Sequence, residues 1–271
     1  MRKTVLLTGA AGGVARFLRT ELAGHYDLRL SDRVILEDLG DNESFVAADL
    51  ADMEAVRRAV EGVDAIIHLG AFSVEGSWET ILHANIEGTY NIYEAARHAG
   101  VRRIVFASSN HAVGFYERSK TIDHSVYPRP DSRYGLSKVF GEALASLYAD
   151  KYGVTSLCIR IGNVDEKPCD VRLLSIWISP RDLAQVVSIG IEHPEIRFEI
   201  VYGMSNNACT WWDNTNARRL GYRPADRSEE HAAEVLASFS AQTGDAVADR
   251  HQGGRFCSTE SGGDLAKTGS N

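Results

Sequence analysis

The sequence predicts an α/β protein with a doubly wound parallel sheet, and three observations carry this prediction. Short apolar runs alternate with amphipathic stretches from residue 4 to residue 162. A glycine-rich turn directly follows the first apolar run, and the alternation loosens beyond residue 162. Strands that alternate with helices form a parallel sheet covered on both faces. We therefore expect a Rossmann-like domain at 1–162, a small C-terminal substrate-binding lobe at 163–257 and a flexible tail at 258–271.

Each expected element follows from a local pattern. Six strands are short apolar runs bounded by turn residues, at 4–9, 27–32, 44–49, 64–70, 103–109 and 155–162. Apolar residues three and four positions apart predict helices between them, at 13–24, 51–62, about 78–98 and, after a loop with Pro128 and Pro130, about 131–152. In the lobe, helical patterns span 179–193 and 228–242, and a strand pattern spans 197–203. The tail is rich in Gly and Ser.

The composition excludes several classes of protein. The chain has 271 residues and a net charge of −8, which argues against nucleic acid or an anionic membrane as its main partner. It lacks the apolar run of about 18 residues that a membrane span needs, and its first residues lack a signal peptide pattern. The cysteines are scattered and are expected to be reduced thiols in a cytoplasmic protein. No cluster has metal-ligand spacing, so we expect no metal.

The first turn, TGAAGGVA, has the spacing of a dinucleotide-binding turn. Gly9, Gly12 and Ala15 lie three residues apart between a strand and a helix. Glycines allow a tight turn and a close approach of backbone N–H groups to a pyrophosphate, and the start of the helix adds a positive dipole end. Asp32 ends the next strand, where a carboxylate would hold the ribose of NAD and repel the 2′-phosphate of NADP. A plain strand–helix turn, with Asp32 as a turn cap, is the alternative.

The segment RYGLSK predicts an acid–base pair. Tyr134 and Lys138 are four residues apart and share one face of the expected helix. A neighbouring ammonium group favours the phenolate, so we expect the pKa of Tyr134 to be lowered and the residue to act as a general base. Ser109, at the end of the fifth expected strand, is placed to hydrogen-bond the reacting oxygen. The alternative is an ordinary pair on an exposed helix.

The ordered set of motifs resembles the extended short-chain dehydrogenase/reductase family. Besides the turn, it comprises Asp32, DL at 49–50, HLGA at 68–71, Asn85, FASS at 106–109 and YGLSK. Ala15 departs from the family, which usually has glycine there. Over a longer stretch, HLGAFSVE, FASSNHAVGFY, YGLSK, VRLLSIWIS and WWDN resemble the uronate dehydrogenases of that family. This resemblance implies NAD-dependent oxidation of galacturonate or glucuronate at C1 to an aldaric acid lactone.

The motifs and the resemblance together define an expected site. The expected cofactor-binding residues are Gly9, Ala11, Gly12, Gly13, Val14, Asp32, Asp49, Leu50, Leu69, Gly70, Ala71, Asn85, Tyr134, Lys138 and Ile161. Asp49 and Leu50 would read the adenine edge. The expected catalytic residues are Tyr134, Lys138 and Ser109.

For the substrate, the resemblance implies a carboxylate partner, Arg172, whose planar fork suits bidentate binding. The other expected substrate-binding residues are Ser73, Ser109, Asn110, His111, Tyr134 and Asn163. Asn163 stands where uronate dehydrogenases typically have serine, and the loop before Arg172 also differs from theirs. The alternatives are a surface arginine at 172, turn caps at 73 and 110, and a structural hydrogen-bonding role for His111.

Three rival functions remain at this point. A nucleotide-sugar epimerase or dehydratase shares the cofactor domain and the Tyr–Lys pair, but it usually needs a larger C-terminal lobe with more basic contacts. A sugar dehydrogenase for another polyhydroxy acid, or an NAD-sensing protein, would also have this fold, although NAD-sensing proteins typically lose the Tyr or the Lys. We expect a small sugar acid as partner, and the family resemblance implies a homo-oligomer.

Overall fold

A seven-stranded parallel sheet organises the molecule. The computed structural model describes residues 2–238 and 244–259. The strands follow the order β3-β2-β1-β4-β5-β6-β9, and every pair is parallel. They are β1 (Thr4–Thr8), β2 (Asp27–Asp32), β3 (Glu43–Ala47), β4 (Ala65–His68), β5 (Arg103–Ser109), β6 (Thr155–Ile161) and β9 (Phe198–Gly203). This confirms the predicted fold class.

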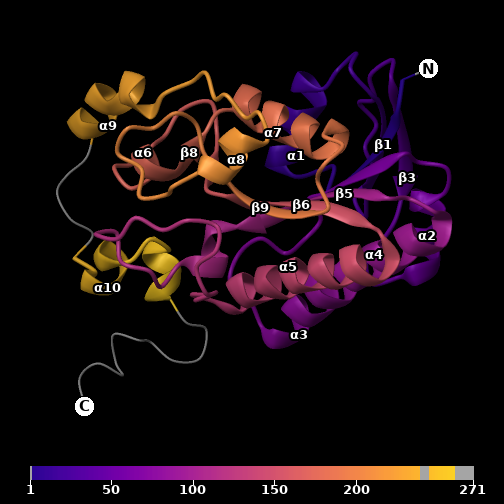
Figure 1. Cartoon of the computed structure of the whole chain (residues 1–271), viewed down its shortest axis with the longest axis horizontal. Helices are drawn as coiled ribbons and strands as arrows, with labels where there is room; N and C mark the ends of the chain where they lie inside the picture. Colours follow the sequence, from indigo (N-terminus) through magenta and orange to yellow (C-terminus); the bar gives the residue numbers. More distant parts are fainter. Residues whose placement is uncertain (1, 239–243, 260–271) are drawn as a thin grey trace.

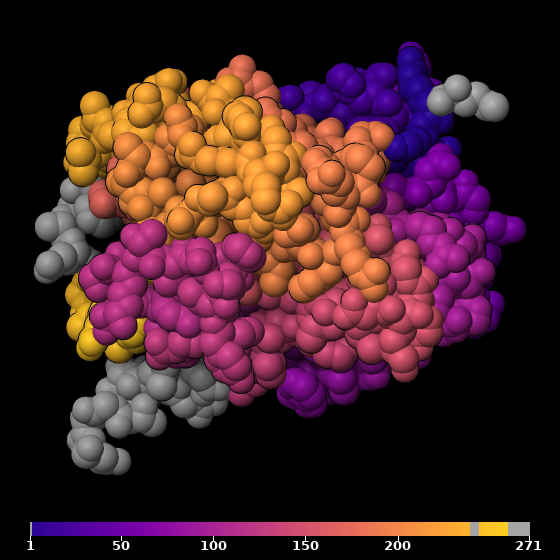
Figure 2. Space-filling view, viewed as in Figure 1, coloured from indigo at the N-terminus to yellow at the C-terminus, as the bar shows by residue number. Residues whose placement is uncertain are grey.

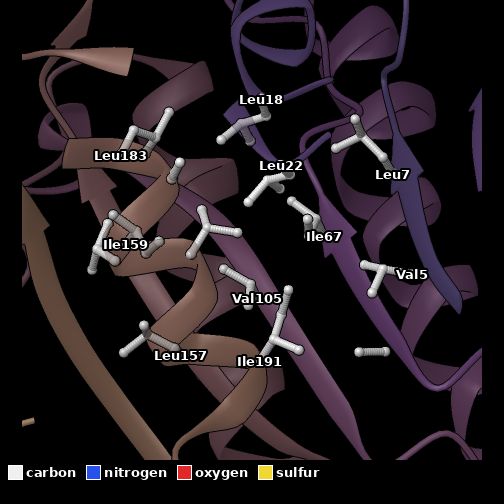
Figure 3. Close-up of a cluster of buried hydrophobic side chains, with 14 of the residues drawn as sticks. Val5, Leu7, Leu18, Leu22, Ile67, Val105, Leu157, Ile159, Leu183 and Ile191 are labelled. Atoms are coloured by element: carbon white, nitrogen blue, oxygen red, sulfur yellow. The ribbon is translucent and has the colours of Figure 1, made fainter. Parts of the chain in front are cut away.

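Helices cover both faces of the sheet (Figure 1). One face packs against α1 (Gly13–Glu21) and α7 (Pro180–Glu192), and the other against α2 (Met53–Val60), α4 (Gly88–Ala99) and α5 (Arg133–Tyr152). Successive side chains of a strand point to opposite faces. In β1, Val5 and Leu7 therefore join the core beneath α1 and α7, shown in Figure 3, whereas Leu6 joins the core beneath the other three helices.

Shorter elements complete the fold, and most of them lie at the carboxyl ends of the strands. They are η2 (Asn110–Val113), β7 (Asn163–Val164), α6 (Leu173–Ile176), β8 (Trp177–Ile178), α8 (Thr215–Arg219), η3 (Ser228–His231), α9 (Ala232–Ser238), α10 (Ala246–Arg250) and η4 (Gly254–Cys257). A third core cluster anchors them, and in it Trp212 stacks on Tyr202 with ring centroids 4.7 Å apart. Figure 2 shows the segments that follow β5 (magenta) and β9 (orange) packed together at one end of the molecule.

The segment 180–203 differs from the expectation. The strand pattern at 197–203 was expected in the separate lobe, but β9 pairs with β6 from Ser156↔Phe198 to Ile161↔Gly203 and is the seventh strand of the main sheet. The helix before it, α7, packs against β5 and α1. Without β9, β6 would be the edge strand of the sheet. A parallel strand can be added there only through a long crossover, and α7 supplies it. The division at residue 162 stays a prediction.

Two expected helices also differ. The helix expected at about 78–98 is interrupted: α3 (Trp78–Ile81) leads into a π-helical turn, η1 (Leu82–Glu87), before α4 begins. The helix expected at 228–242 is described only to Ser238, as η3 and α9. Its residues 239–242 and residues 260–271 of the expected flexible tail lie outside the described part of the chain.

An unexpected C-terminal strap, residues 244–259, returns to the sheet. It comprises α10 and η4 and lies beside the segment that follows β5 (Figure 1). Three backbone hydrogen bonds hold it there: Gly253 N–H donates to Gly114 O (2.9 Å), Gln252 N–H to Tyr116 O (2.8 Å) and Arg118 N–H to Arg250 O (2.9 Å). The strap therefore closes over the end of the molecule where the active site is expected.

Some classes of feature are not found among the described residues. No helix there combines the length and the apolar character that crossing a bilayer requires. Within 2–238 and 244–259, no three or more His, Cys, Asp or Glu side chains come together in a way that could hold a metal ion. The four cysteines are free thiols, and Cys158 and Cys257 are buried.

Candidate active site

The main cleft opens where the strand order reverses. β1 lies between β2 and β4, so the loops that leave β1 and β4 diverge to opposite faces and leave a crevice at the carboxyl ends of these strands. Gly9 follows β1 with φ of 69°, and a Cβ there would lie 2.8 Å from the Cα of Gly70, which follows β4. Only glycine satisfies both constraints, because other residues rarely adopt this φ and would collide.

The start of α1 fits a pyrophosphate. Its N-cap, Gly12, has no side chain to bond the first N–H groups of the helix, and a Cβ built on Gly13 would meet no atom within 4 Å. The backbone N–H groups at a helix start need acceptors, and anions supply them. The start of α1 thus offers open space beside N–H groups that no side chain caps, as a dinucleotide requires.

Asp32 is fixed at the edge of this turn. Its carboxylate accepts hydrogen bonds from Ala11 N–H (3.0 Å) and from Val34 N–H (3.0 Å). Asp32 therefore does cap the turn, as the alternative interpretation expected. The side chain nevertheless lines the cleft, so these bonds hold the carboxylate at the position where it would meet a ribose.

The cleft consists of two neighbouring pockets that share Gly9, Asp32 and Ala71. The nucleotide-end pocket is lined by Gly9, Ser31, Asp32, Arg33, Ala48, Asp49, Leu50, Gly70, Ala71, Phe72, Thr80 and Ala84. The substrate-end pocket is lined by Gly9, Gly12, Gly13, Val14, Ala15, Asp32, Leu69, Ala71, Ser73, Val74, Ala107, Ser108, Ser109, His111, Tyr134, Lys138, Ile161, Gly162, Asn163, Val164 and Phe256. Most residues expected from the sequence thus meet in one cleft. The exceptions are Ala11, Asn85, Asn110 and Arg172.

Tyr134 and Lys138 lie on one buried face of α5. Tyr134 is 8% exposed and Lys138 is 5% exposed, so the alternative of an exposed helix pair is wrong. Ser109 lines the same pocket and is near enough to the Tyr134 hydroxyl to affect its pKa. Lys138 Nζ lies 5.4 Å from the centroid of the Tyr134 ring and 5.2 Å from that of Phe106. The expected catalytic trio therefore converges.

Burial dominates the ionisation of this pair. It raises the pKa of Tyr134 to about 12, although Ser109 acts in the opposite direction. It also lowers the pKa of Lys138 to about 8. The expected lowering of the Tyr134 pKa by Lys138 is therefore wrong for this structure. The physical reason is that removing the phenol from water disfavours its charged form more than the surrounding groups favour it.

Two carboxylates hold α5 in place. The Glu75 carboxylate accepts from the backbone N–H of Arg133 (2.8 Å) and of Tyr134 (3.4 Å), which places a negative charge at the positive end of the helix. Further along, the buried Glu142 accepts from the Ser108 hydroxyl (2.6 Å) and twice from Arg160 (2.9 Å each). These bonds join α5 to β5 and β6, which carry the other residues of the site.

Asn163 and Ser73 lie where the resemblance implied, in the lining of the substrate-end pocket. Among the described residues, Asn163 Oδ1 is buried and has no hydrogen-bond partner. A buried acceptor without a partner is costly, so a ligand hydroxyl would stabilise this group.

Asn110 and Arg172 lie behind the pocket lining. With its amide oriented to donate to Ile161 O (3.2 Å), Asn110 accepts from Arg172 Nη2 (3.2 Å). Arg172 Nε also donates to Gln252 O in the C-terminal strap (2.9 Å). Burial, with a contribution from the charge of Arg118, lowers the pKa of Arg172 to about 10. Arg172 is half-buried rather than fully exposed, and a Cβ on Gly254 of the strap would lie 2.7 Å from its Nε, so the strap covers part of the side chain.

Asn85 has a structural use that differs from cofactor binding. It lies in the π-helical turn and is 2% exposed. Its amide donates to Phe72 O (3.0 Å) and Ser137 Oγ (2.9 Å), and its oxygen accepts from Phe72 N–H (2.8 Å). These bonds tie the loop after β4 to the catalytic helix, and the expected contact of Asn85 with the cofactor stays a prediction.

Phe256 of the strap is the main site residue that the sequence did not reveal. Its ring stacks on that of His111, with centroids 3.8 Å apart and an interplanar angle of 26°, and lies 6.2 Å from that of Tyr134. The local sequence, GRFC, carries no known motif, and it lies far along the chain from His111 and Tyr134. Only the fold reveals that this aromatic side chain forms a wall of the pocket.

Comparison with known proteins agrees with this geometry. The model of the NAD dependent epimerase/dehydratase family matches residues 5–165. A uronate dehydrogenase from Pseudomonas putida is 48% identical over 254 residues, which cover 93% of this chain and 94% of that protein.

Solved structures extend the comparison over the whole chain. The glucuronic acid dehydrogenase from Chromohalobacter salexigens is 46% identical, with a TM-score of 0.93 over 96% of this chain and 98% of that one. A mutant of uronate dehydrogenase from Agrobacterium tumefaciens, in complex with NAD, is 41% identical, with a TM-score of 0.92 over 95% and 98% of the two chains. The chain belongs to the NAD dependent epimerase/dehydratase family, within the extended short-chain dehydrogenases/reductases.

Proposed function

We propose that this protein is an NAD-dependent oxidoreductase that oxidises a hexuronic acid, galacturonate or glucuronate, at C1 to an aldaric acid lactone. The observation that carries the proposal is the single cleft that joins a glycine-built nucleotide end to Tyr134, Lys138 and Ser109. The relatives named uronate dehydrogenase, at 42–48% identity over at least 93% of the chain, support the substrate class.

The nucleotide end supplies the cofactor site. The Gly9–Gly13 turn would hold the pyrophosphate, Asp32 the adenosine ribose, and Asp49 and Leu50 the adenine edge. NAD bound there supplies a hydride acceptor. The Asp32 carboxylate would repel the 2′-phosphate of NADP, so we propose a preference for NAD.

The chemical step requires loss of a proton and a hydride from the same C–OH group. Tyr134 takes the hydroxyl proton, Ser109 hydrogen-bonds the oxygen as its bond to C1 becomes a carbonyl, and the hydride leaves C1 for the cofactor. Tyr134 must be a phenolate to accept this proton, and the positive charge of Lys138 beside the phenol is proposed to oppose the effect of burial, which raises the pKa of Tyr134. The product is the lactone, because C1 already carries the ring oxygen.

The substrate end supplies hydrogen bonds and a counter-charge. Arg172 is the proposed partner of the sugar carboxylate, and its position behind the lining means that a shift of its side chain would bring the guanidinium forward. Asn110 would move with it or bond a ring hydroxyl. Ser73, His111 and Asn163 face the pocket and are proposed to bond hydroxyl groups, and the unpaired oxygen of Asn163 is suited to accept from one.

The rival functions have weaker support. A UDP-galactose 4-epimerase structure is 22% identical with a TM-score of 0.72, a likeness that shows the fold alone. A nucleotide-sugar enzyme must also hold a second pyrophosphate beyond the sugar, whereas Phe256 already lines the substrate-end pocket here.

Two further properties belong to the proposal. The four free thiols support a reducing compartment, the cytoplasm. Self-association, implied by the family resemblance, is also proposed, and analytical ultracentrifugation of the purified protein measures it directly.

A panel of sugars tests the function. Purified protein and NAD are mixed with galacturonate, glucuronate, galactose or glucose, and NADH is followed by absorbance. Rapid turnover of the two acids with slow turnover of the neutral sugars is expected. Equal turnover of acids and neutral sugars would reduce the proposal to an unspecified sugar dehydrogenase, and no turnover of either acid would refute it.

A further inference from the structure

A buried carboxylate, Asp131, lies at the junction of three segments of the site. Its side chain is 0% exposed, and its Oδ2 lies 2.7 Å from Nδ1 of His111. Its Oδ1 accepts a hydrogen bond from the Ser132 hydroxyl (2.9 Å). Asp131 immediately precedes the cap of α5, so it connects the catalytic helix to the segment that follows β5.

Three glycines allow the chain to close around this carboxylate. A Cβ on Gly114 would lie 1.8 Å from Asp131 Oδ2, and one on Gly253 would lie 1.9 Å from the same atom. A Cβ on Gly135 would meet Oδ1 at 3.2 Å and His111 O at 2.3 Å. The carboxylate is therefore enclosed by backbone from the β5 loop, from α5 and from the C-terminal strap. This enclosure fixes its orientation toward His111.

The other side of the imidazole faces the reaction site. His111 lines the substrate-end pocket, and its ring lies 5.8 Å from that of Tyr134. Phe256 stacks on it and limits its rotation. Since Nδ1 is used by Asp131, Nε2 is the ring nitrogen that remains for a ligand in the pocket.

We propose that Asp131 is a positioning residue that acts through His111. Its carboxylate accepts a hydrogen bond from Nδ1–H and so fixes this tautomer, because the hydrogen bond made by one ring nitrogen decides where the proton lies. Nε2 is then an acceptor, and it receives a hydrogen bond from a hydroxyl group of the sugar beside Tyr134. This role rests on the proposed function, since it assigns the ligand of Nε2 to the sugar substrate.

A purely structural role for Asp131 makes different predictions. If the carboxylate only joined the strap to α5, its replacement would lower stability but would leave the His111 tautomer unchanged. Its effect on turnover would also add to that of removing the imidazole. Tautomer and additivity are therefore the two readouts that separate the two roles.

The first test measures the tautomer directly. The full chain is labelled with ¹⁵N-histidine, long-range ¹H–¹⁵N spectra are recorded near neutral pH, and the His111 signals are assigned by their loss in His111→Gln. We expect a proton on Nδ1 and a bare Nε2 in the wild type, and a proton on Nε2 in Asp131→Asn, whereas a purely structural role would leave the tautomer of the variant unchanged. A proton on Nε2 with a bare Nδ1, or protons on both nitrogens, would overturn the proposal without any variant of Asp131.

The second test is a double-mutant cycle on turnover. Asp131→Asn can present an amide N–H to Nδ1 and favour the opposite tautomer. We expect it to reduce kcat/KM for glucuronate by about 10- to 100-fold, as is typical when a partner that orients a functional histidine is removed. The Kd for NAD should stay within about twofold. In the His111→Gln background, Asp131→Asn should cost less than about twofold more, because residues that act as a unit are not additive.

Equal losses in both backgrounds would contradict the proposal. The matched control is Asp64→Asn, which removes a carboxylate that accepts from Thr4 N–H (2.7 Å) at the amino ends of the strands, away from the cleft, and should leave kcat/KM unchanged. If Asp131→Asn does not fold, a wild-type spectrum with the proton on Nε2 would still overturn the proposal. If the wild type oxidises no uronate, the proposed function fails, whereas the tautomer measurement still tests the link between Asp131 and His111.

Discussion

The two ends of the cleft are built in different ways. The nucleotide end is mainly backbone: a turn of glycines and the uncapped start of α1 lie within a few residues of each other in the sequence. The same turn and helix start, Gly12 to Ala15, also form one side of the substrate-end pocket. The other walls of that pocket are mainly side chains, and they come from β5, α5, the loop after β4, the segment after β6 and the C-terminal strap. One end is therefore encoded locally, whereas the other depends on the whole fold.

This difference decides which amino-acid substitutions each end of the cleft tolerates. A backbone cradle depends on the absence of side chains, so a substitution at Gly9 would block it by collision with Gly70. A pocket of converging side chains can exchange one group for another and so change its substrate. We expect mutations at the substrate end to separate catalysis from NAD binding, and those at the nucleotide end to change cofactor choice.

The largest expected effect is that of Tyr134→Phe. Removal of a general base typically costs about two to four orders of magnitude in rate. The variant should lose turnover to that extent but bind NAD with unchanged affinity, measured by calorimetry. Tyr127→Phe, at an 82% exposed tyrosine, is the control. Retention of more than about a tenth of the wild-type kcat would show that Tyr134 is not the base.

Arg172→Ala comes next and probes charge at the substrate end. Loss of one partner from a desolvated charge pair costs about 2–5 kcal/mol. The specificity constant for galacturonate or glucuronate should therefore fall by about 30-fold or more, with a smaller loss for neutral sugars. Arg197→Ala, at an exposed arginine paired with Asp150, is a matched control. A loss of equal size for acids and neutral sugars would remove Arg172 as the carboxylate partner.

Asp32→Ala tests the nucleotide end. Repulsion between two unit charges about 4 Å apart in water is about 1 kcal/mol, so the preference for NAD over NADP should narrow by about five- to tenfold. The ratio of kcat/KM values for the two cofactors measures this change, with Asp41→Ala as the control for loss of a surface charge. Wild-type turnover that is equal with NAD and NADP would contradict the role given to Asp32.

The smallest effect concerns stability and pH. Burial lowers the pKa of Lys138 from 10.5 to about 8, so folding disfavours its charged form. This cost is complete below about pH 8 and fades as the pH rises toward 10.5, because the unfolded chain then binds a proton that the folded chain does not.

Lys138→Met should therefore raise Tm at pH 7 by up to about 10 °C, because the lowered pKa corresponds to about 3 kcal/mol and each kcal/mol to about 2–4 °C for a chain of this size. This increase in Tm should shrink between pH 8 and pH 10. Loss of the cation–π contact between the Lys138 ammonium and the Phe106 ring offsets part of the increase. Scanning calorimetry at several pH values measures both, with Lys120→Met, at an exposed lysine, as the control. An increase in Tm that is the same at every pH would show that it does not come from the lowered pKa of Lys138.

The contrast between local and long-range structure also explains how much of the fold and of the site could be predicted from the sequence. Alternating patterns predicted the first six strands within a few residues, and the turn at Gly9–Gly13 located the nucleotide end, since both signals are local. The seventh strand was misplaced because its pairing with β6 is a long-range contact that no local pattern records. Phe256 and Asp131 were missed for the same reason: their roles arise only where the strap, α5 and the β5 loop meet.

The hydrogen-bond partners of Asn85 and the direction of the Tyr134 pKa depend on burial. A motif gives the residue types but not how deeply the fold encloses them. Asn85 has its amide occupied by Phe72 and Ser137, and Tyr134 is removed from water by its surroundings. Estimating either effect requires the packed structure.

The most direct test of the account follows the hydrogen at C1. Glucuronate carrying deuterium at C1 is incubated with the protein and NAD, and the reduced cofactor and the sugar product are analysed by mass spectrometry. The account predicts one deuterium in the nicotinamide ring of the reduced cofactor and none in the lactone. Unlabelled reduced cofactor, or a product that retains the deuterium, would show that the hydride does not come from C1 and would contradict the proposed function.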